Sequence, residues 1–331
     1  MLNSKNLRIF AGFLLAALLF NCAPEAPHSN PLDPYNKANS ASGILLEGRV
    51  MEKNQPHLPL DSCMVILSPE QKFTSTDAAG SFSFDNLTPG EYQLVIQRHG
   101  YASDTTRFAT DTLKSDPLNF YLNGNPFLIR SQFFSEFIDQ WWPDPFFLVK
   151  FGAIFDDPDG AADISDVTFT MPDAGITKVF EKTARPDSFF VQLDATDFPD
   201  NNVFEMVGKG AQIIARDKSG AVTSSGPFYL YRIIDTSPAP LQPAGMDTAS
   251  ARPLLHWESY RASFAFTYEI SMFFVNAGIP VLIHSRKAIS SGETEYQYPD
   301  SLAAGQYFWT IGVRDNLGNF SRSKEASFLV Q

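Results

Sequence analysis

The feature that most constrains the fold is an alternation of apolar and polar residues in short segments from residue 43 onward. Ser81-Phe82-Ser83-Phe84 and Glu91-Tyr92-Gln93-Leu94 are two examples, and Asp77-Ala78-Ala79-Gly80 is one of the turn sequences between such segments. Side chains of a β-strand alternate between its two faces, and turn signals recur roughly every 8–12 residues in antiparallel sandwiches. The pattern therefore predicts an all-β chain built from antiparallel β-sandwiches.

The length of the chain sets the number of modules. Its 331 residues exceed what one sandwich uses and fit three tandem modules of about 100 residues each. Aromatic residues are frequent at 14%, including 30 Phe, and charged residues are modest at 19%, as expected for β-domains with aromatic cores. The formal charge of −12 disfavours nucleic acid and anionic lipid surfaces as partners.

The N-terminal segment indicates export. Lys5 and Arg8 precede an apolar run, Ile9–Phe20, which ends at Asn21-Cys22. Twelve helical residues rise roughly 18 Å, less than the ~30 Å hydrocarbon core, so the run predicts a secretion signal rather than a permanent span. Leu19-Phe20-Asn21-Cys22 resembles the lipobox of bacterial lipoproteins, which implies a signal peptide at 1–21 and a covalent lipid on Cys22. The alternatives are plain secretion with a buried Cys22 and an uncleaved anchor.

The proline-rich composition of residues 22–42 predicts a flexible tether. Prolines 24, 27, 31 and 34 favour extended backbone, and Asn30-Pro31-Leu32-Asp33-Pro34 resembles the spacer of many envelope lipoproteins. A chain of this length reaches roughly 25 Å, enough to hold a folded module clear of lipid headgroups. Ala23 after the cysteine, in place of Asp, favours the outer membrane by the sorting rule of some lipoproteins. Periplasmic and surface exposure both stay open.

The first predicted module is residues 43–123. Its landmarks in order are G-x-V, P-L, V-x-L, T-x-x-x-G-x-F-x-F, L-x-x-G-x-Y-x-L and G-Y. This set resembles the carboxypeptidase regulatory-like domain, a transthyretin-like sandwich, and the resemblance implies a non-catalytic stalk or adaptor. Cys63 lies in an apolar run, where a lone thiol is expected to be a small core residue.

The second predicted module, residues 124–235, contains recurring apolar runs at immunoglobulin-like length. Trp141 and Trp142 lie together between polar and turn residues. Such a pair predicts either an aromatic platform for a sugar or partner, or a cap on the core or a domain junction.

The same module holds a cluster of acidic residues: Asp156, Asp157, Asp159 and Asp163. Carboxylate oxygens are ligands that Ca²⁺ prefers, although the spacing differs from an EF-hand loop. Pro158-Asp159-Gly160 is also a strong turn signal without any metal. A calcium site and a plain acidic turn are thus the two interpretations, and no other cofactor is predicted.

The third predicted module is residues 236–331. The order L-x-W-E, Y-x-I, L-x-x-G-x-Y-x-W-x-I and F-x-V resembles a bacterial fibronectin type III domain. The resemblance implies that Trp257 lies in the core and that Tyr307 ties down the loop before its strand. Trp309 follows on the same strand face as Tyr307 and is expected to pack in the core.

One turn sequence occurs twice. Residues 215–223 and 313–321 both read Arg-Asp followed by a glycine three residues after the aspartate, and Asp217 and Asp315 lie one sandwich length apart. In such turns the aspartate accepts backbone hydrogen bonds and the glycine supplies a positive φ. We therefore expect the second and third modules to share a final hairpin and a similar fold.

No motif of an enzyme is present. The five histidines have no metal-ligand spacing, and H-E-x-x-H, G-x-S-x-G and nucleotide-binding loops do not occur. The sequence predicts a non-catalytic, membrane-anchored envelope lipoprotein that acts as an interaction or adhesion scaffold. The alternative is a surface carbohydrate-binding lipoprotein that uses exposed aromatic residues. Either would reach the membrane through its lipid and bind an envelope protein or glycan.

Overall fold

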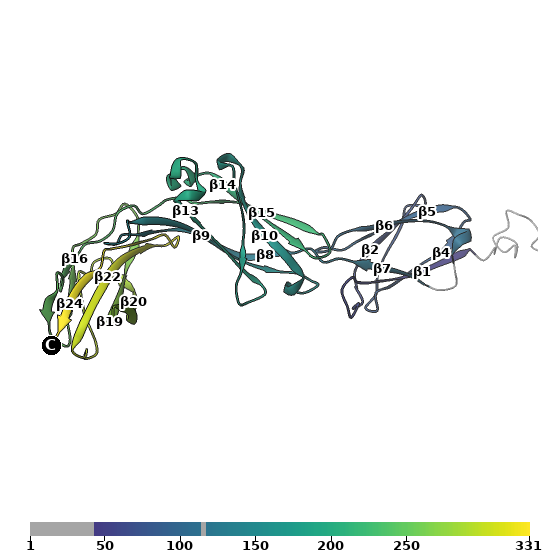
Figure 1. The fold of residues 1–331 in the computed structure, drawn as a ribbon. Coiled ribbons are helices and arrows are strands. Elements are labelled where there is room, and N and C mark those ends of the chain that lie inside the picture. Colours follow the sequence, from purple (N-terminus) through teal and green to yellow (C-terminus); the bar gives the residue numbers. More distant parts are fainter. Residues whose placement is uncertain (1–42, 114–116) are drawn as a thin grey trace, which may run out of the picture.

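The computed structural model describes residues 43–113 and 117–331, which form three β-sandwiches in a row (Figure 1). Their buried hydrophobic residues form three separate clusters, within residues 46–122, 149–230 and 234–330. The predicted all-β fold of tandem sandwiches is confirmed. Ile234, which the sequence analysis placed in the second module, packs in the third core. The predicted signal peptide, Cys22 and the tether lie outside the described residues.

The first module packs a sheet of order β4-β1-β7 against one of order β3-β2-β5-β6. Its elements are β1 (Ile44–Glu52), β2 (Met64–Ser68), β3 (Lys72–Ser75), β4 (Ser81–Leu87), β5 (Glu91–Gln97), β6 (Asp104–Ala109), η1 (Thr110–Thr112) and β7 (Leu118–Leu122). In β5 the predicted alternation is exact, with Tyr92, Leu94 and Ile96 buried. Gly48 of β1 lies under the Phe82 ring, where a Cβ would come within 2.3 Å of that ring. Cys63 is buried and free, as expected, and burial raises the pKa of its thiol.

The second module has one sheet of order β11-β10-β14-β15 and contributes β12-β13-β9-β8 to a longer sheet. Its elements are β8 (Phe127–Ile138), β9 (Phe146–Asp156), η2 (Ala161–Asp163), β10 (Ile164–Met171), η3 (Pro172–Ala174), β11 (Ile176–Val179), β12 (Glu181–Lys182), β13 (Ser188–Asp194), η4 (Ala195–Asp197), η5 (Pro199–Asn201), η6 (Val203–Met206), β14 (Gly210–Asp217) and β15 (Val222–Tyr229). Phenylalanines fill its core. The buried ring of Phe151 lies 4.7–6.1 Å from four others, those of Phe133, Phe169, Phe180 and Phe228.

The third module has a small sheet of order β16-β18-β21 and a large one containing β23-β22-β19-β20, in which β24 also pairs with β22 and β17 pairs with β24. Its elements are β16 (Pro240–Gln242), β17 (Asp247–Ala249), β18 (Leu254–Trp257), β19 (Phe266–Asn276), β20 (Ile279–Ser290), β21 (Glu295–Gln297), β22 (Gly305–Asp315), β23 (Phe320–Arg322) and β24 (Ala326–Val330). Trp257 and Trp309 are buried in its core, as predicted. The Trp309 indole N–H donates to the Pro243 carbonyl at 2.9 Å.

The predicted tyrosine and aspartate roles are confirmed. The Tyr307 hydroxyl donates to the Ala303 carbonyl at 2.9 Å, and Tyr92 makes the same bond to the carbonyl of Thr88 at 3.0 Å. At the repeated turns, Asp217 Oδ1 accepts from the Ala221 amide, and Asp315 Oδ1 accepts from that of Asn319. The two turn glycines, 220 and 318, both have φ of +96°.

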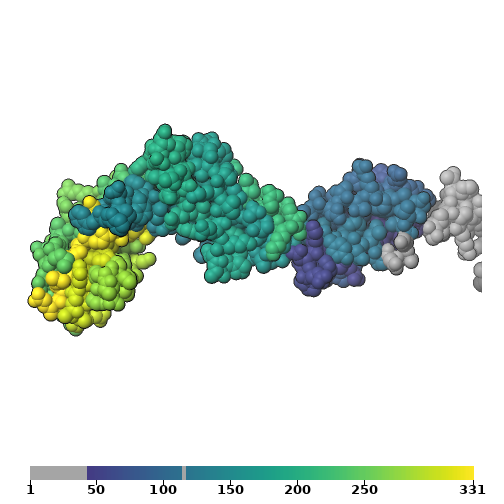
Figure 2. Space-filling model, viewed as in Figure 1, coloured from purple at the N-terminus to yellow at the C-terminus, as the bar shows by residue number. Residues whose placement is uncertain are grey.

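The second and third modules share one sheet. Strand β8 pairs in parallel with β23 through Glu136↔Phe320, Phe137↔Ser321 and Ile138↔Arg322, so the order runs β12-β13-β9-β8-β23-β22-β19-β20. The space-filling view shows a broad contact between these modules and a narrower one between the first and second (Figure 2). Modules two and three therefore form a mechanically continuous unit.

The loop bond of Tyr307 gives a stability prediction. Tyr307→Phe keeps the buried ring but leaves the Ala303 carbonyl without its donor, so the free energy of unfolding should fall by about 1 kcal/mol. Chemical denaturation followed by tryptophan fluorescence measures the change. Tyr231→Phe, at an exposed tyrosine, is the control and should leave the midpoint unchanged; equal effects of both variants would contradict the assigned role.

Candidate functional site

Carboxylates gather where the first module meets the second. Asp157 and Asp159 lie in the turn after β9, Asp163 ends η2, and Asp217 ends β14. They meet Asn123, the residue after β7, whose Nδ2 donates to Asp217 Oδ2 at 2.5 Å. Within the described residues, Asp157, Asp163 and Asp217 form the one group of acidic, His or Cys side chains whose ligand atoms all lie within 4.8 Å. We call the four aspartates and Asn123 the acidic junction.

The backbone of the linker approaches these carboxylates closely. The Gly124 amide donates to Asp159 Oδ2 at 2.7 Å, and a Cβ on Gly124 would come within 2.7 Å of Asp157 Oδ1. The linker is held on the other side by the first module, since the Asn125 amide donates to the Gly100 carbonyl at 2.8 Å. Glycine at 124 is thus required by the close approach of the two modules.

The acidic junction is short of hydrogen-bond donors. Asp157 and Asn123 are only 3% and 8% exposed. Four oxygens there are buried without a hydrogen-bond partner: Asn123 Oδ1, Asp157 Oδ2, Asp159 Oδ1 and Asp163 Oδ2. Burial, together with the neighbouring carboxylates, raises the pKa of Asp157 to about 6, and burial also raises the pKa of Asp159. Ionisation of all the carboxylates at once is therefore unfavourable in this site when no cation is bound.

The predicted calcium ligands need one correction. Asp156 points away from the cluster: its side chain is exposed and accepts from the Asp157 amide at 2.9 Å. Asp156 is the last residue of β9 and Asp157 the first residue of the turn, and only Asp157 is buried in the junction. Two members were missed. Asp217 had been interpreted only as a turn residue, and Asn123 carries no local signal at all.

The junction between the second and third modules, called the second junction below, is held by side-chain hydrogen bonds and an ion pair. Asn319 Oδ1 accepts from the Ser135 amide at 2.9 Å and from the Ser135 hydroxyl at 3.1 Å. Asn319 Nδ2 donates to Asp315 Oδ2 at 2.9 Å, and the Arg232 guanidinium lies 3.4 Å from the same oxygen. All but Arg232 are buried, so these bonds fix the second module against the third.

Trp141 and Trp142 lie beside this junction. The Trp141 indole N–H donates to the Glu325 carbonyl at 2.9 Å, and the Lys324 ammonium lies 4.4 Å from the centre of its ring. Trp141 is nevertheless 69% exposed and lines a groove of about 550 Å³ between the modules. Trp142 is 87% exposed and is not among the groove's lining residues. Of the two tryptophans, Trp141 alone lies at the groove.

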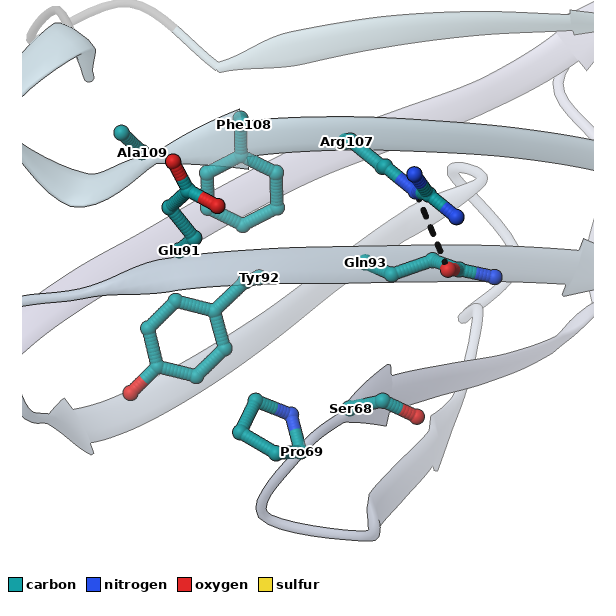
Figure 3. A pocket seen from close by; sticks show the side chains of 8 residues that line it. All are labelled: Ser68, Pro69, Glu91, Tyr92, Gln93, Arg107, Phe108 and Ala109. Atoms are coloured by element: carbon teal, nitrogen blue, oxygen red, sulfur yellow. Dashed lines mark hydrogen bonds between the residues drawn. The ribbon is translucent and has the colours of Figure 1, made fainter.

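A second hollow lies on the first module beside β5 and β6 (Figure 3). Its volume is about 640 Å³, and its floor carries Tyr92 and Phe108, whose rings stack with centroids 5.9 Å apart. Arg107 donates to Gln93 Oε1 at its rim at 3.3 Å. The Tyr92 hydroxyl is bonded to Glu70 and Thr88 outside the hollow, so the hollow presents stacked rings and one internal Arg107–Gln93 bond.

Strand β20 is an exposed edge. It ends the long sheet, and within the described residues its outer side pairs with no strand. Ile279, Val281, Leu282 and Ile283 follow a tight turn at Ala277-Gly278 and are all exposed. Exposed apolar side chains on both faces of an edge strand are typical of a surface that another chain covers.

Comparisons with known proteins support the first module. Residues 46–123 match the carboxypeptidase regulatory-like domain family, which confirms the predicted resemblance for that part of the chain. No curated protein matches the chain. Within the described residues, no helix is long and apolar enough to cross a membrane.

Several solved structures of tandem β-domains are similar to the chain at low identity. They include the major pilin subunit BcpA of Bacillus cereus (11% identity, 87% of this chain and 98% of that one, TM-score 0.29). The FN1–FN3 domains of chicken CNTN1 are 9% identical over 88% of this chain and 99% of that one, with a TM-score of 0.33. The fibronectin(III)-like modules of CbhA from Clostridium thermocellum are 10% identical over 62% and 92%, with a TM-score of 0.30.

The second junction gives a prediction about cooperativity. Asn319→Ala leaves the Ser135 amide buried without an acceptor, which costs about 1–3 kcal/mol. We expect modules two and three to unfold in separate calorimetric transitions in this variant and together in the wild type. Asn316→Ala, at an exposed position of the same hairpin, is the matched control. Unchanged coupling in Asn319→Ala would show that the bond does not hold the junction.

Proposed function

We propose that the chain is a lipid-anchored, non-catalytic scaffold of the bacterial cell envelope, in the outer membrane, whose third module binds another envelope protein. The observation that carries this proposal is the apolar edge strand β20. An exposed edge offers a row of unpaired backbone N–H and C=O groups, and an extended segment of a partner can add to it as a further strand. Scaffolds that join proteins need such a surface and no catalytic groups.

The composition of β20 specifies the partner segment. Its first half presents Val281, Leu282 and Ile283, and its second half presents Arg286 and Lys287, all exposed. A complementary strand would carry apolar residues opposite the first half and acidic residues opposite the second. The occupant of this edge is therefore an extended, apolar and acidic segment of a second protein.

The arrangement of the modules supports a scaffold. The sandwiches follow one another along the chain, and β20 belongs to the module most distant in sequence from the tether (Figure 1). The continuous sheet through β8 and β23 fixes the direction in which the third module points. A lipid on Cys22, the tether and these modules together would hold the β20 edge away from the membrane.

The β20 edge gives a test of partner binding. Val281→Lys/Ile283→Lys places two charges where the partner strand would bury them, so recovery of crosslinked protein partner from membranes should fall about tenfold or more. Both side chains are exposed in the chain itself (44% and 38%), so the fold is kept. Phe73→Lys, on the exposed edge strand β3, is the control and should retain the partner. Equal recovery with all three proteins would contradict the proposal.

A second candidate, carbohydrate binding, is favoured by the exposed indole of Trp141 at its groove. Lys324 covers one face of that ring, so a sugar would stack on the other. The same membrane preparation separates the two candidates. Retention of polysaccharide that Trp141→Ala/Trp142→Ala abolishes, with no protein partner recovered, would favour carbohydrate binding and overturn the scaffold.

The lipid anchor is tested separately. Cys22→Ala should abolish incorporation of labelled palmitate and move the protein from the detergent phase to the aqueous phase on phase separation, since acyl chains supply the membrane affinity. Cys63→Ala changes the other cysteine of the chain and should keep both label and partition. A Cys22→Ala protein that still enters the detergent phase would point to an uncleaved apolar segment as the anchor.

A further inference from the structure

We propose that the acidic junction binds one Ca²⁺ ion, which clamps the first module to the second through Asn123, Asp157, Asp159, Asp163 and Asp217. The inference is independent of the partner and of the lipid anchor. It starts from the orphaned oxygens. Six buried side-chain nitrogen or oxygen atoms in the described residues have no hydrogen-bond partner, and four of them are the acceptor oxygens of this junction. Buried polar groups are nearly always paired, so four unpartnered acceptor oxygens gathered in one place favour a bound cation.

A buried amide oxygen of Asn123 also lacks a partner at this junction. Asn123 belongs to the linker, it is 92% buried, and its amide group reaches into the cluster to contact Asp217 while its own Oδ1 has no partner. An amide oxygen is a neutral Ca²⁺ ligand that commonly completes a set of carboxylates. Ligands then come from both sides of the junction, from the linker and from the second module.

Among the described residues, the second junction contains a positively charged partner for its turn aspartate, and the first junction does not. There the equivalent turn aspartate, Asp315, receives an amide donor from Asn319 and a positive charge from Arg232, a residue of the preceding linker. At the first junction the turn aspartate, Asp217, receives an amide donor from linker residue Asn123 and faces carboxylates instead. No ion pair reaches Asp157, Asp159, Asp163 or Asp217 from the described residues. Lys53 is near enough to counteract part of the burial-induced rise in the pKa of Asp159 but makes no ion pair with it, so a bound cation would supply at this joint the direct positive charge that Arg232 supplies at the other.

The ligand chemistry selects calcium. All candidate ligands are oxygens, and a cluster without histidine or cysteine does not suit Zn²⁺. The oxygens come from a turn, a short 3-10 helix, a strand end and a linker, an irregular set that fits the flexible six- to eight-fold coordination of Ca²⁺ better than the strict octahedron of Mg²⁺.

The experiment is a calorimetric titration of CaCl₂ into the full chain, purified in detergent and freed of divalent ions with a chelator. We expect a single site with a Kd of about 10⁻⁴ M or lower and a calcium-dependent rise in melting temperature. Asp157→Asn and Asp217→Asn should each weaken binding by roughly tenfold or more, because affinity depends on ligand charge. Asp156→Asn is the matched control: it lies in the same loop, and its amide oxygen can still accept from the Asp157 amide.

A second readout separates a metal site from a structural role. In chelator, Asp157→Asn removes one of several crowded carboxylates and should melt at or above the temperature of the wild type, whereas a purely structural aspartate would lower it. No heat and no melting shift up to about 10 mM CaCl₂ would overturn the proposal. So would equal weakening by Asp156→Asn and Asp157→Asn, or tighter binding of MgCl₂ than of CaCl₂.

Discussion

The structure depends on how the buried charge of one turn aspartate per junction is balanced. Asp217 and Asp315 each close a final hairpin, and each also faces the linker that enters its module. A carboxylate in such a place holds two elements together only if both of its oxygens are satisfied, since a buried unpaired charge costs more than the contact contributes. Arg232 meets that condition at the second junction. The first junction concentrates further carboxylates around Asp217 instead.

The two junctions therefore differ in kind. Modules two and three are joined by backbone pairing between β8 and β23, by the bonds of Asn319 and by the contact of Trp141 with Glu325, all of which are supplied by the chain itself. The first module is joined through the short linker at Asn123 and Gly124, where few backbone bonds cross and the charge balance is open. An external ion can change the stiffness of this joint alone.

Much of the fold was predictable because it rests on local rules. Period-two alternation located the strands, the turn glycines marked the hairpins, and the Leu-x-x-Gly-x-Tyr unit placed Tyr92 and Tyr307 correctly. The acidic junction was only half predictable. Asp157, Asp159 and Asp163 are close in sequence, but Asp217 and Asn123 reach them through the relative placement of strands and modules, which no local pattern contains. Asp156, which was predicted with them, is exposed and bonds to the Asp157 amide, because composition does not tell which carboxylates become buried together.

The exposure of β20 was also not predictable from the sequence. Val281-Leu282-Ile283 has the composition of a core strand, and sequence alone gives no reason to expect its side chains in water. Whether an apolar strand is covered depends on how far the facing sheet extends, and the small sheet β16-β18-β21 leaves most of β20 uncovered. A sandwich with sheets of such unequal size has to expose part of the larger one. Natural sheets protect exposed edges with charges or prolines, and here Pro280 lies near the start of the strand and Arg286 and Lys287 lie in its second half. Val281, Leu282 and Ile283 lie between them without such protection, and they are the part that a partner strand would cover.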